Sequence, residues 1–402
     1  MVSIIYLLII IIIIVILIKF KVDISLVLFS GSILVGFLFH SGVKNFFVTL
    51  VNSIKSPDTL SLVATVILVI YFGALLAKRG DLSRMVSALR VLINDNRVSM
   101  VVPSSIMGLL PMPGGALISA PMLEEGSKGF QLNPAEKTFL NFWFRHLWEY
   151  CWPLYPGLIV ASTILKLPIF VLSRFQFPLT LVAILAGLLF GLKKIKFKAG
   201  IEKTKKLSSL IHLFRSTWHI SLIIIFVIAF KINVLYVMIG VSLLVSVLTK
   251  FNKKEWKEVV KESFQYKTIL LLFSVMFFKA ILLNSGAIAS LTKVFTPQGP
   301  SLWLLLFFAP FLVGFLTGVN HAYVGVAFPI LLPFFLSGGV NLAYIMFSYA
   351  SGFAGVLLSP VHLCLVLTKQ YFKADFSPIY KLLIPPVIFV WLFAFLMFII
   401  YK

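Results

Sequence analysis

The chain is poor in charge, in acidic residues and in cysteine. Only 12% of its 402 residues are charged, and 13 Asp and Glu stand against 35 Lys and Arg. Soluble domains have about twice that charged fraction. The two cysteines, Cys151 and Cys364, lie in apolar segments without CxxC spacing, which argues against a disulfide framework and against a zinc site.

Enzyme signatures are missing as well. The sequence contains no HExxH, no P-loop, no GxSxG and no paired Asp motif for metal-assisted phosphate chemistry. We therefore predict that the protein is not an enzyme and has no catalytic residue, no metal and no cofactor.

What the sequence has is apolar runs, with hydrophobic residues at 60%. A membrane-spanning helix needs about 20 apolar residues. Ten segments qualify, at about residues 2–18, 23–39, 59–77, 137–165, 169–192, 214–230, 232–249, 267–285, 341–368 and 380–400. The predicted fold class is an all-α polytopic membrane protein with ten transmembrane helices, whose first partner is the lipid bilayer.

Two further apolar stretches, 98–123 and 300–336, are interrupted at their middle by helix breakers. The breakers are Pro111-Met112-Pro113-Gly114-Gly115 in the first stretch and Thr317-Gly318-Val319-Asn320 in the second. We expect each stretch to form a re-entrant hairpin that enters and leaves the membrane on the same side. Such backbone is tolerated at membrane depth only where it is buried in protein or lines a cavity.

The net charge of +22 is placed as in membrane proteins, which argues against a nucleic-acid partner. With ten crossings and two re-entrant hairpins, most Lys and Arg fall on one side. That side receives Lys19, Lys21, Lys78, Arg79, Arg84, Arg90, Arg97, Lys128, the lysines of 193–206 and of 250–261, Lys369 and Lys373. The positive-inside rule assigns this side to the cytoplasm. We therefore expect a multi-pass protein of the cell inner membrane with both termini outside.

The order of segments occurs twice along the chain. Each half reads span, span, surface helix, span, surface helix, hairpin, long span, span, with the surface helices at 44–55, 82–93, 251–266 and 287–296. We predict two repeats, 1–195 and 212–402, joined by a basic cytoplasmic linker at 196–211. Because five crossings per half is an odd number, the second repeat is inverted, as in many secondary transporters.

The two long spans, 137–165 and 341–368, contain breakers of their own. Trp152–Gly157 interrupts the first, and Gly352, Gly355 and Ser359-Pro360 lie within the second. A break leaves backbone N–H and C=O groups without helical partners. We expect the two breaks and the two hairpin tips to meet and form a site for a small polar solute; the alternative is a pair of proline kinks without a ligand. The candidate substrate-binding residues are Pro111, Pro113, Gly114, Gly115, Arg145, Pro153, Pro156, Thr317, Asn320, His321, Ser359, Pro360 and His362.

Ionisable residues inside a span are costly and usually functional. Arg145, His146 and Glu149 are spaced to share one face of a helix. One hypothesis is that Arg145 binds an anionic group while Glu149, together with His146, takes up the coupling ion. With a proton as that ion, it predicts symport. The alternative is a structural ion pair between Arg145 and Glu149.

Four motifs resemble those of an uncharacterised prokaryotic integral-membrane family predicted to have ten spans. They are Gly108-Leu-Leu-Pro-Met-Pro-Gly-Gly115, Phe144-Arg-His-Leu-Trp-Glu-Tyr150, Trp152-Pro-Leu-Tyr-Pro-Gly157 and Ser359-Pro-Val-His-Leu-Cys364. That family is similar to the ion-transporter superfamily, which includes gluconate permeases, citrate and dicarboxylate transporters, and arsenite and sodium/proton antiporters. The resemblance implies an elevator mechanism and a homodimer. The tips differ from the Ser-Asn-Thr tips of the sodium–dicarboxylate branch.

The function predicted from the sequence is secondary active transport of a small anionic solute, a carboxylate, coupled to H⁺ or Na⁺, by symport or antiport. The alternatives are an ion channel and an intramembrane enzyme or lipid-handling protein. A channel needs a continuous polar pore, and no span carries a polar stripe along its length.

Overall fold

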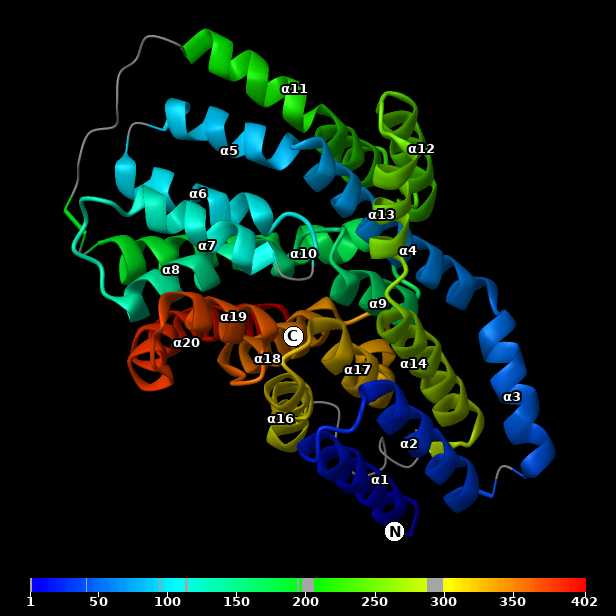
Figure 1. Cartoon of the computed structure of the whole chain (residues 1–402). Coiled ribbons are helices and arrows are strands. Elements are labelled where there is room, and N and C mark those ends of the chain that lie inside the picture. The colour runs from blue at the N-terminus through cyan, green and yellow to red at the C-terminus, as the bar shows by residue number, and fades with distance from the viewer. Residues whose placement is uncertain are drawn as a thin grey trace.

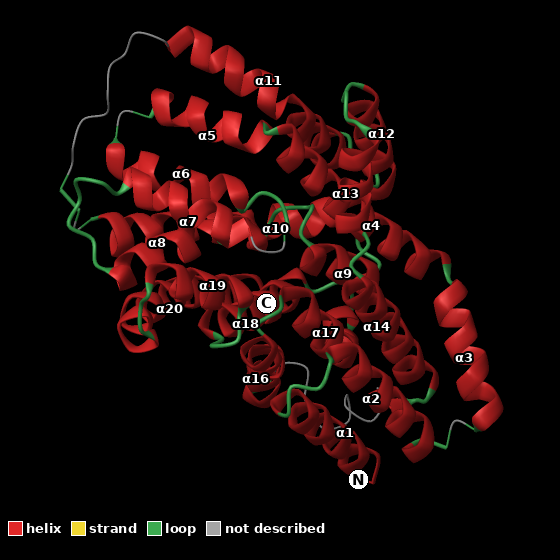
Figure 2. Cartoon of the chain, viewed as in Figure 1, coloured by secondary structure: helices red, strands yellow, loops and turns green. Residues whose placement is uncertain are grey.

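The computed structural model describes residues 2–40, 42–93, 95–112, 115–193, 195–196, 206–287 and 299–402. Within these ranges the regular elements are helices joined by loops, without a strand (Figure 2). The predicted all-α fold class is confirmed at this level.

The first half of the chain begins with two helices and ends with a helix that continues as a short π-helix. Its elements are α1 (Val2–Lys19), α2 (Ile24–Leu38), α3 (Val43–Lys55), α4 (Pro57–Arg79), α5 (Asp81–Leu92), α6 (Asn96–Met107), α7 (Gly115–Gly126), α8 (Pro134–Arg145), η1 (Leu147–Tyr150), α9 (Pro156–Leu165), α10 (Ile169–Ala186) and η2 (Gly187–Leu192).

The second half is again built of helices. Its elements are α11 (Lys206–Ile224), η3 (Ile225–Ala229), α12 (Val234–Val247), α13 (Lys253–Ser263), α14 (Tyr266–Asn284), α16 (Pro300–Thr317), α17 (Asn320–Leu336), α18 (Leu342–Leu358), α19 (Leu363–Phe372) and α20 (Phe376–Tyr401). The surface helix expected at 287–296 lies, except for residue 287, outside the described residues.

Seven helices in the described part of the chain are long and apolar enough to cross a membrane. They are Pro57–Arg79, Ile169–Leu192, Lys206–Ala229, Lys253–Asn284, Pro300–Thr317, Leu342–Phe372 and Phe376–Tyr401. Shorter apolar helices, among them Ile24–Leu38, Val234–Val247 and Asn320–Leu336, accompany them. These helices support a multi-pass membrane protein, while the count of ten crossings stays a prediction.

Helices from the two halves pack against each other rather than forming separate bundles. Helix α14 lies against α2 and α3, and α4 lies against α12 and α13. At one edge, α5 and α11 run side by side (Figure 1). The chain therefore has one continuous apolar core, to which both halves contribute.

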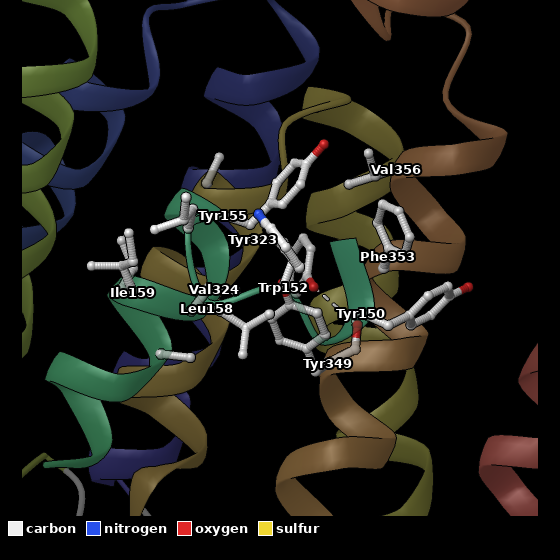
Figure 3. Packing of buried hydrophobic residues seen from close by; sticks show 14 of the residues in the cluster. Tyr150, Trp152, Tyr155, Leu158, Ile159, Tyr323, Val324, Tyr349, Phe353 and Val356 are labelled. Atoms are coloured by element: carbon white, nitrogen blue, oxygen red, sulfur yellow. Dashed lines mark hydrogen bonds between the residues drawn. The ribbon is translucent and has the colours of Figure 1, made fainter. Parts of the chain in front are cut away.

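The helices α6 and α7 form one helical hairpin, and α16 and α17 form another. The first hairpin packs against α8 and α19, and the second packs against α18 and α9. Aromatic and aliphatic side chains from α9, α17 and α18 pack together, and Tyr323, Tyr349 and Phe353 are fully buried among them (Figure 3). This packing brings the tip of each hairpin to an interrupted helix.

Candidate solute site at four helix breaks

Helix α8 begins at a capping box and ends earlier than the sequence suggests. The Asn133 side chain accepts from the Glu136 backbone N–H, and the Glu136 carboxylate accepts from the Asn133 N–H. The helix ends at Arg145, with His146 as its C-cap, and a short 3₁₀ turn follows before α9 begins at Pro156. The expected single helical face carrying Arg145, His146 and Glu149 is therefore wrong, because Arg145 and Glu149 do not belong to one helix.

Arg145 reaches the tip of the first hairpin instead of Glu149. Its Nη1 donates to the Met107 carbonyl and its Nη2 to the Met112 carbonyl, both at 3.0 Å. A side chain at Gly115 would collide with the guanidinium, since a Cβ there would lie 2.6 Å from Nη1. Arg145 is 4% exposed. Among the described residues no carboxylate forms an ion pair with it, so the alternative of an Arg145–Glu149 pair is also wrong.

Glu149 meets the tip of the second hairpin. Asn320, the first residue of α17, donates from Nδ2 to Glu149 Oε2 at 2.8 Å. The Asn320 Oδ1 atom is buried and has no hydrogen-bond partner. Gly157 makes room for this amide, because a Cβ there would lie 2.0 Å from Oδ1. The second tip and the first break therefore share one buried polar contact.

The second long span is interrupted at one place only. Helix α18 continues through Gly352 and Gly355 and ends at Leu358, contrary to the expectation that these glycines break it. Both glycines instead permit a close approach of a neighbouring helix. A Cβ at Gly355 would lie 2.2 Å from the Phe311 carbonyl oxygen of α16, and a Cβ at Gly352 would lie 2.2 Å from the Tyr323 ring of α17. The break is confined to the four residues from Ser359 to His362.

His362 connects the second break to the second hairpin tip and to the first break. Its Nδ1 lies 2.6 Å from the Gly318 carbonyl in the second tip, and its Nε2 lies 3.0 Å from His146 Nε2 in the first break. His146 Nε2 also lies 3.7 Å from Glu149 Oε1. Two breaks and one tip thus meet at a pair of imidazoles.

The remaining predicted residues lie near this cluster without joining its hydrogen bonds. Pro156 is the first residue of α9, Ser359 is buried and Pro360 is exposed. The Thr317 hydroxyl donates within its own helix to Val313 O. Pro111 lies in the first tip and Pro153 in the first break, and the His321 ring has no hydrogen bond to another described residue. Pro113 and Gly114 lie outside the described residues.

A cavity of about 820 Å³ opens toward the first tip. It is lined by α4, by α13 and the start of α14, and by Met112 and Ile118 of the first hairpin. Lys78 and Glu258, which form a 2.6 Å ion pair, lie in its wall. Met112 therefore borders the cavity on one side while its carbonyl accepts from Arg145 on the other.

The sequence matches, from residue 1 to residue 401, the family described as "Protein of unknown function (DUF401)". The chain belongs to the DUF401 family. A comparison with curated proteins gives no match. The expected resemblance to an uncharacterised family is thereby confirmed over residues 1–401, whereas similarity to the ion-transporter superfamily stays a prediction.

Three polar residues of this DUF401 chain join the site or hold together the helices around it without having been predicted. Cys364 offers its sulfur beside His146 and His362. The Tyr349 hydroxyl donates to the Glu149 carbonyl at 3.0 Å, and Asn141 bonds Ser104, the Ala116 carbonyl and Thr368. Asn141 stands out in the sequence as an amide one turn before Arg145; the roles of the other two depend on contacts between distant segments.

Proposed function

We propose that this protein is a secondary active transporter of a small anionic solute, such as a carboxylate, coupled to H⁺ or Na⁺. The observation that carries the proposal is the buried guanidinium of Arg145, which has backbone carbonyls as its hydrogen-bond acceptors but no carboxylate counter-ion among the described residues. A charge removed from water is strongly destabilised unless it is paired. An anion arriving between the two hairpin tips and the two helix breaks would supply a counter-ion in direct contact with the guanidinium.

The backbone N–H groups freed at the breaks would be the further donors to such an anion. The Asn320 amide is engaged with Glu149, and the imidazoles of His146 and His362 face each other. Planar guanidinium groups match carboxylate geometry with two parallel N–H donors. The solute would compete with Met107 O and Met112 O for Arg145, so binding would loosen the first tip.

A coupling cation would bind on the Glu149 side of the cluster. Glu149 is the one acidic residue in the described part of the chain at these breaks, and it shares Asn320 with the second tip. Carboxylate and free carbonyl oxygens are suitable ligands for Na⁺, and a carboxylate is also a proton acceptor. Solute and cation would thus bind at neighbouring points and be carried together.

Inverted repeats would give this site its alternating access. Two short loops support the repeat: Phe20-Lys21-Val22-Asp23 after α1 and Phe230-Lys231-Ile232-Asn233 after η3. Lys21 and Lys231 have left-handed φ angles of 60° and 57°. The Asp23 and Asn233 side chains each cap the next helix with a 2.9 Å bond from a backbone N–H. The same local structure at corresponding positions of the two halves is expected if the halves are repeats of one unit.

A second matched pair supports the same division. Helices α9 and α19 each have ten residues and follow a break, and their C-cap residues, Lys166 and Lys373, have φ angles of 55° and 53°. In the charge-based topology, Lys21 and Lys373 are cytoplasmic, whereas Lys231 and Lys166 are outside. Each matched lysine thus lies opposite its counterpart, as an inverted repeat requires.

An elevator movement of the hairpins and broken helices, within a homodimeric scaffold, is the mechanism that the resemblance implies. The cavity beside Met112 supports an approach to the first tip from the side of Lys78 and Lys261. That side is cytoplasmic by the positive-inside rule.

The proposal is tested by uptake into proteoliposomes that contain the purified protein. A panel of radiolabelled carboxylates is offered under an inward H⁺ gradient, an inward Na⁺ gradient, or neither. The expected result is saturable accumulation of one solute under one gradient, abolished by the matching ionophore. Flux that does not saturate would indicate a channel, and no flux of any anion would contradict the proposal.

A further inference from the structure

The two imidazoles at the meeting point of the breaks have an unusual arrangement of protons. His146 Nδ1 lies 2.6 Å from the Phe142 carbonyl, and His362 Nδ1 lies 2.6 Å from the Gly318 carbonyl. A carbonyl oxygen only accepts hydrogen bonds, so each Nδ1 must carry a proton. In the neutral ring the lone pair is then on Nε2.

The two Nε2 atoms face each other at 3.0 Å. Two lone pairs at that separation repel, so a positively charged species must lie between them: either an extra proton or a metal ion. An extra proton would need only the two nitrogens. The choice therefore depends on whether further donor atoms point to the same place.

Further donors are present. The Cys364 sulfur and the two imidazoles offer ligand atoms that all lie within 4.8 Å of one another. Glu149 Oε1 is 3.7 Å from His146 Nε2. Two nitrogens and a sulfur are three ligands of the kind found in tetrahedral zinc sites, and the carboxylate oxygen beside His146 is a candidate for the fourth.

We propose that His146 Nε2, His362 Nε2 and Cys364 Sγ bind a borderline-soft divalent cation of the Zn²⁺ class, with Glu149 or an exogenous ligand in the fourth position. On a tetrahedral ion, two nitrogens at 2.0–2.1 Å lie about 3.4 Å apart, so the rings need to separate by only a few tenths of an ångström. A metal-binding histidine usually donates its other ring N–H to a carbonyl or a carboxylate, which fixes the orientation of the ring. The carbonyls of Phe142 and Gly318 would have this role here.

The sequence argument against zinc does not apply to this arrangement. That argument rested on the missing CxxC spacing, which concerns ligands from one short segment. Here His146 and His362 are 216 positions apart and come from different breaks. A bound ion would tie the end of α8 to the start of α19 and so restrain the two interrupted helices relative to each other.

This site does not depend on the proposed transport function, and its test uses the metal alone. Purified full-length protein is treated with a chelator, freed of it and titrated with Co²⁺, whose thiolate complexes have a charge-transfer absorption. We expect one Co²⁺ per chain with that absorption, displaced by Zn²⁺. X-ray absorption of the Zn²⁺-loaded wild-type protein should then show one sulfur at about 2.3 Å and nitrogen or oxygen ligands at about 2.0–2.1 Å.

Cys364→Ser should abolish the charge-transfer absorption, and His362→Gln should weaken Co²⁺ binding at least tenfold. The matched controls are Cys151→Ser, whose thiol accepts from Thr180, and His212→Gln at an exposed position; both should bind Co²⁺ like the wild type. Absence of stoichiometric Co²⁺ and Zn²⁺ binding by monodisperse wild-type protein would overturn the proposal and leave a shared proton between the rings. So would binding unchanged in Cys364→Ser. Solute uptake measured in the presence of chelator reports on the transport function separately.

Discussion

At the scale of residues, the chain places a few polar side chains where a helix has just ended. Arg145 is the last residue of α8, His146 its cap, and Asn320 the first residue of α17. Each side chain contacts a distant segment: Arg145 donates to the backbone of the first hairpin, Asn320 donates to the Glu149 carboxylate, and His146 faces His362. A change at one of them should affect the contact between two segments before it affects the stability of either.

Arg145→Lys should retain the positive charge but lose solute binding. A lysine cannot donate to Met107 O and Met112 O in the two-point geometry of a guanidinium. One carbonyl left without a donor costs about 1–3 kcal/mol, so a lower melting temperature is also expected. Binding of the transported anion to purified protein measures the first effect and thermal unfolding the second. Arg174→Ala, at an exposed position, is the control; Arg145→Lys with unchanged anion affinity would show that Arg145 only holds the hairpin.

Glu149→Gln should abolish cation-driven accumulation while solute exchange continues. The amide oxygen can still accept from Asn320 Nδ2, so the contact with the second tip is kept, but the negative charge that attracts the coupling cation is lost. Counterflow and gradient-driven uptake in the same proteoliposomes distinguish the two activities. Asp375→Asn makes the same chemical change at an exposed residue whose side chain caps no helix. Normal accumulation by Glu149→Gln would rule out Glu149 as the coupling residue.

At the scale of elements, glycines determine how closely the hairpins approach the interrupted helices. A Cβ at Gly108 would lie 2.0 Å from the Arg145 carbonyl, and a Cβ at Gly314 would lie 2.2 Å from the Gly352 carbonyl. Both obstacles are backbone, which cannot rotate away. The two hairpins thus contact their neighbouring long helices, α8 and α18, in the same manner.

Gly314→Ala should destabilise the protein by about 1–3 kcal/mol, the usual cost of an added methyl group in a packed core. The methyl group forces α16 away from α18. The matched control is Gly240→Ala in α12, where a Cβ meets nothing within 4 Å and helix propensity favours alanine. Thermal unfolding in detergent compares the two. Equal melting temperatures for Gly314→Ala and wild type would show that the close approach is not required.

At the scale of the whole molecule, the halves share their packing surfaces. Helix α14 lies against α2 and α3, and α4 lies against α12 and α13. If the halves are inverted repeats, these are two versions of one arrangement. Corresponding loops must then lie on opposite sides of the membrane.

Single cysteines at positions 21 and 231, in a background without Cys151 and Cys364, should react with a membrane-impermeant maleimide from opposite sides. The prediction is that position 21 is labelled only after the cells are opened, and position 231 in intact cells. A cysteine at position 402 should also be labelled in intact cells. Labelling of positions 21 and 231 from the same side would contradict the inverted repeat, and cytoplasmic labelling at 402 would contradict the topology.

The sequence by itself determined the helical, membrane-like character of the chain and some of the places where helices stop. Hydropathy and the effects of proline and glycine are local properties, so Pro111 to Gly115, Thr317 to Asn320 and Ser359-Pro360 could be recognised as breaks without knowing their neighbours. The end of α8 at Arg145 could not, because no breaker stands there; the turn that follows is stabilised by contacts with Asn320 and Tyr349.

Only the tertiary structure decided which polar groups meet. Helical spacing paired Arg145 with Glu149, whereas the folded chain pairs Arg145 with the first hairpin, Glu149 with the second and His146 with His362. Those partners are 33 to 216 positions apart. A hydrogen bond depends on distances of a few tenths of an ångström, and between segments so far apart in sequence those distances are set by the packing of every helix in between.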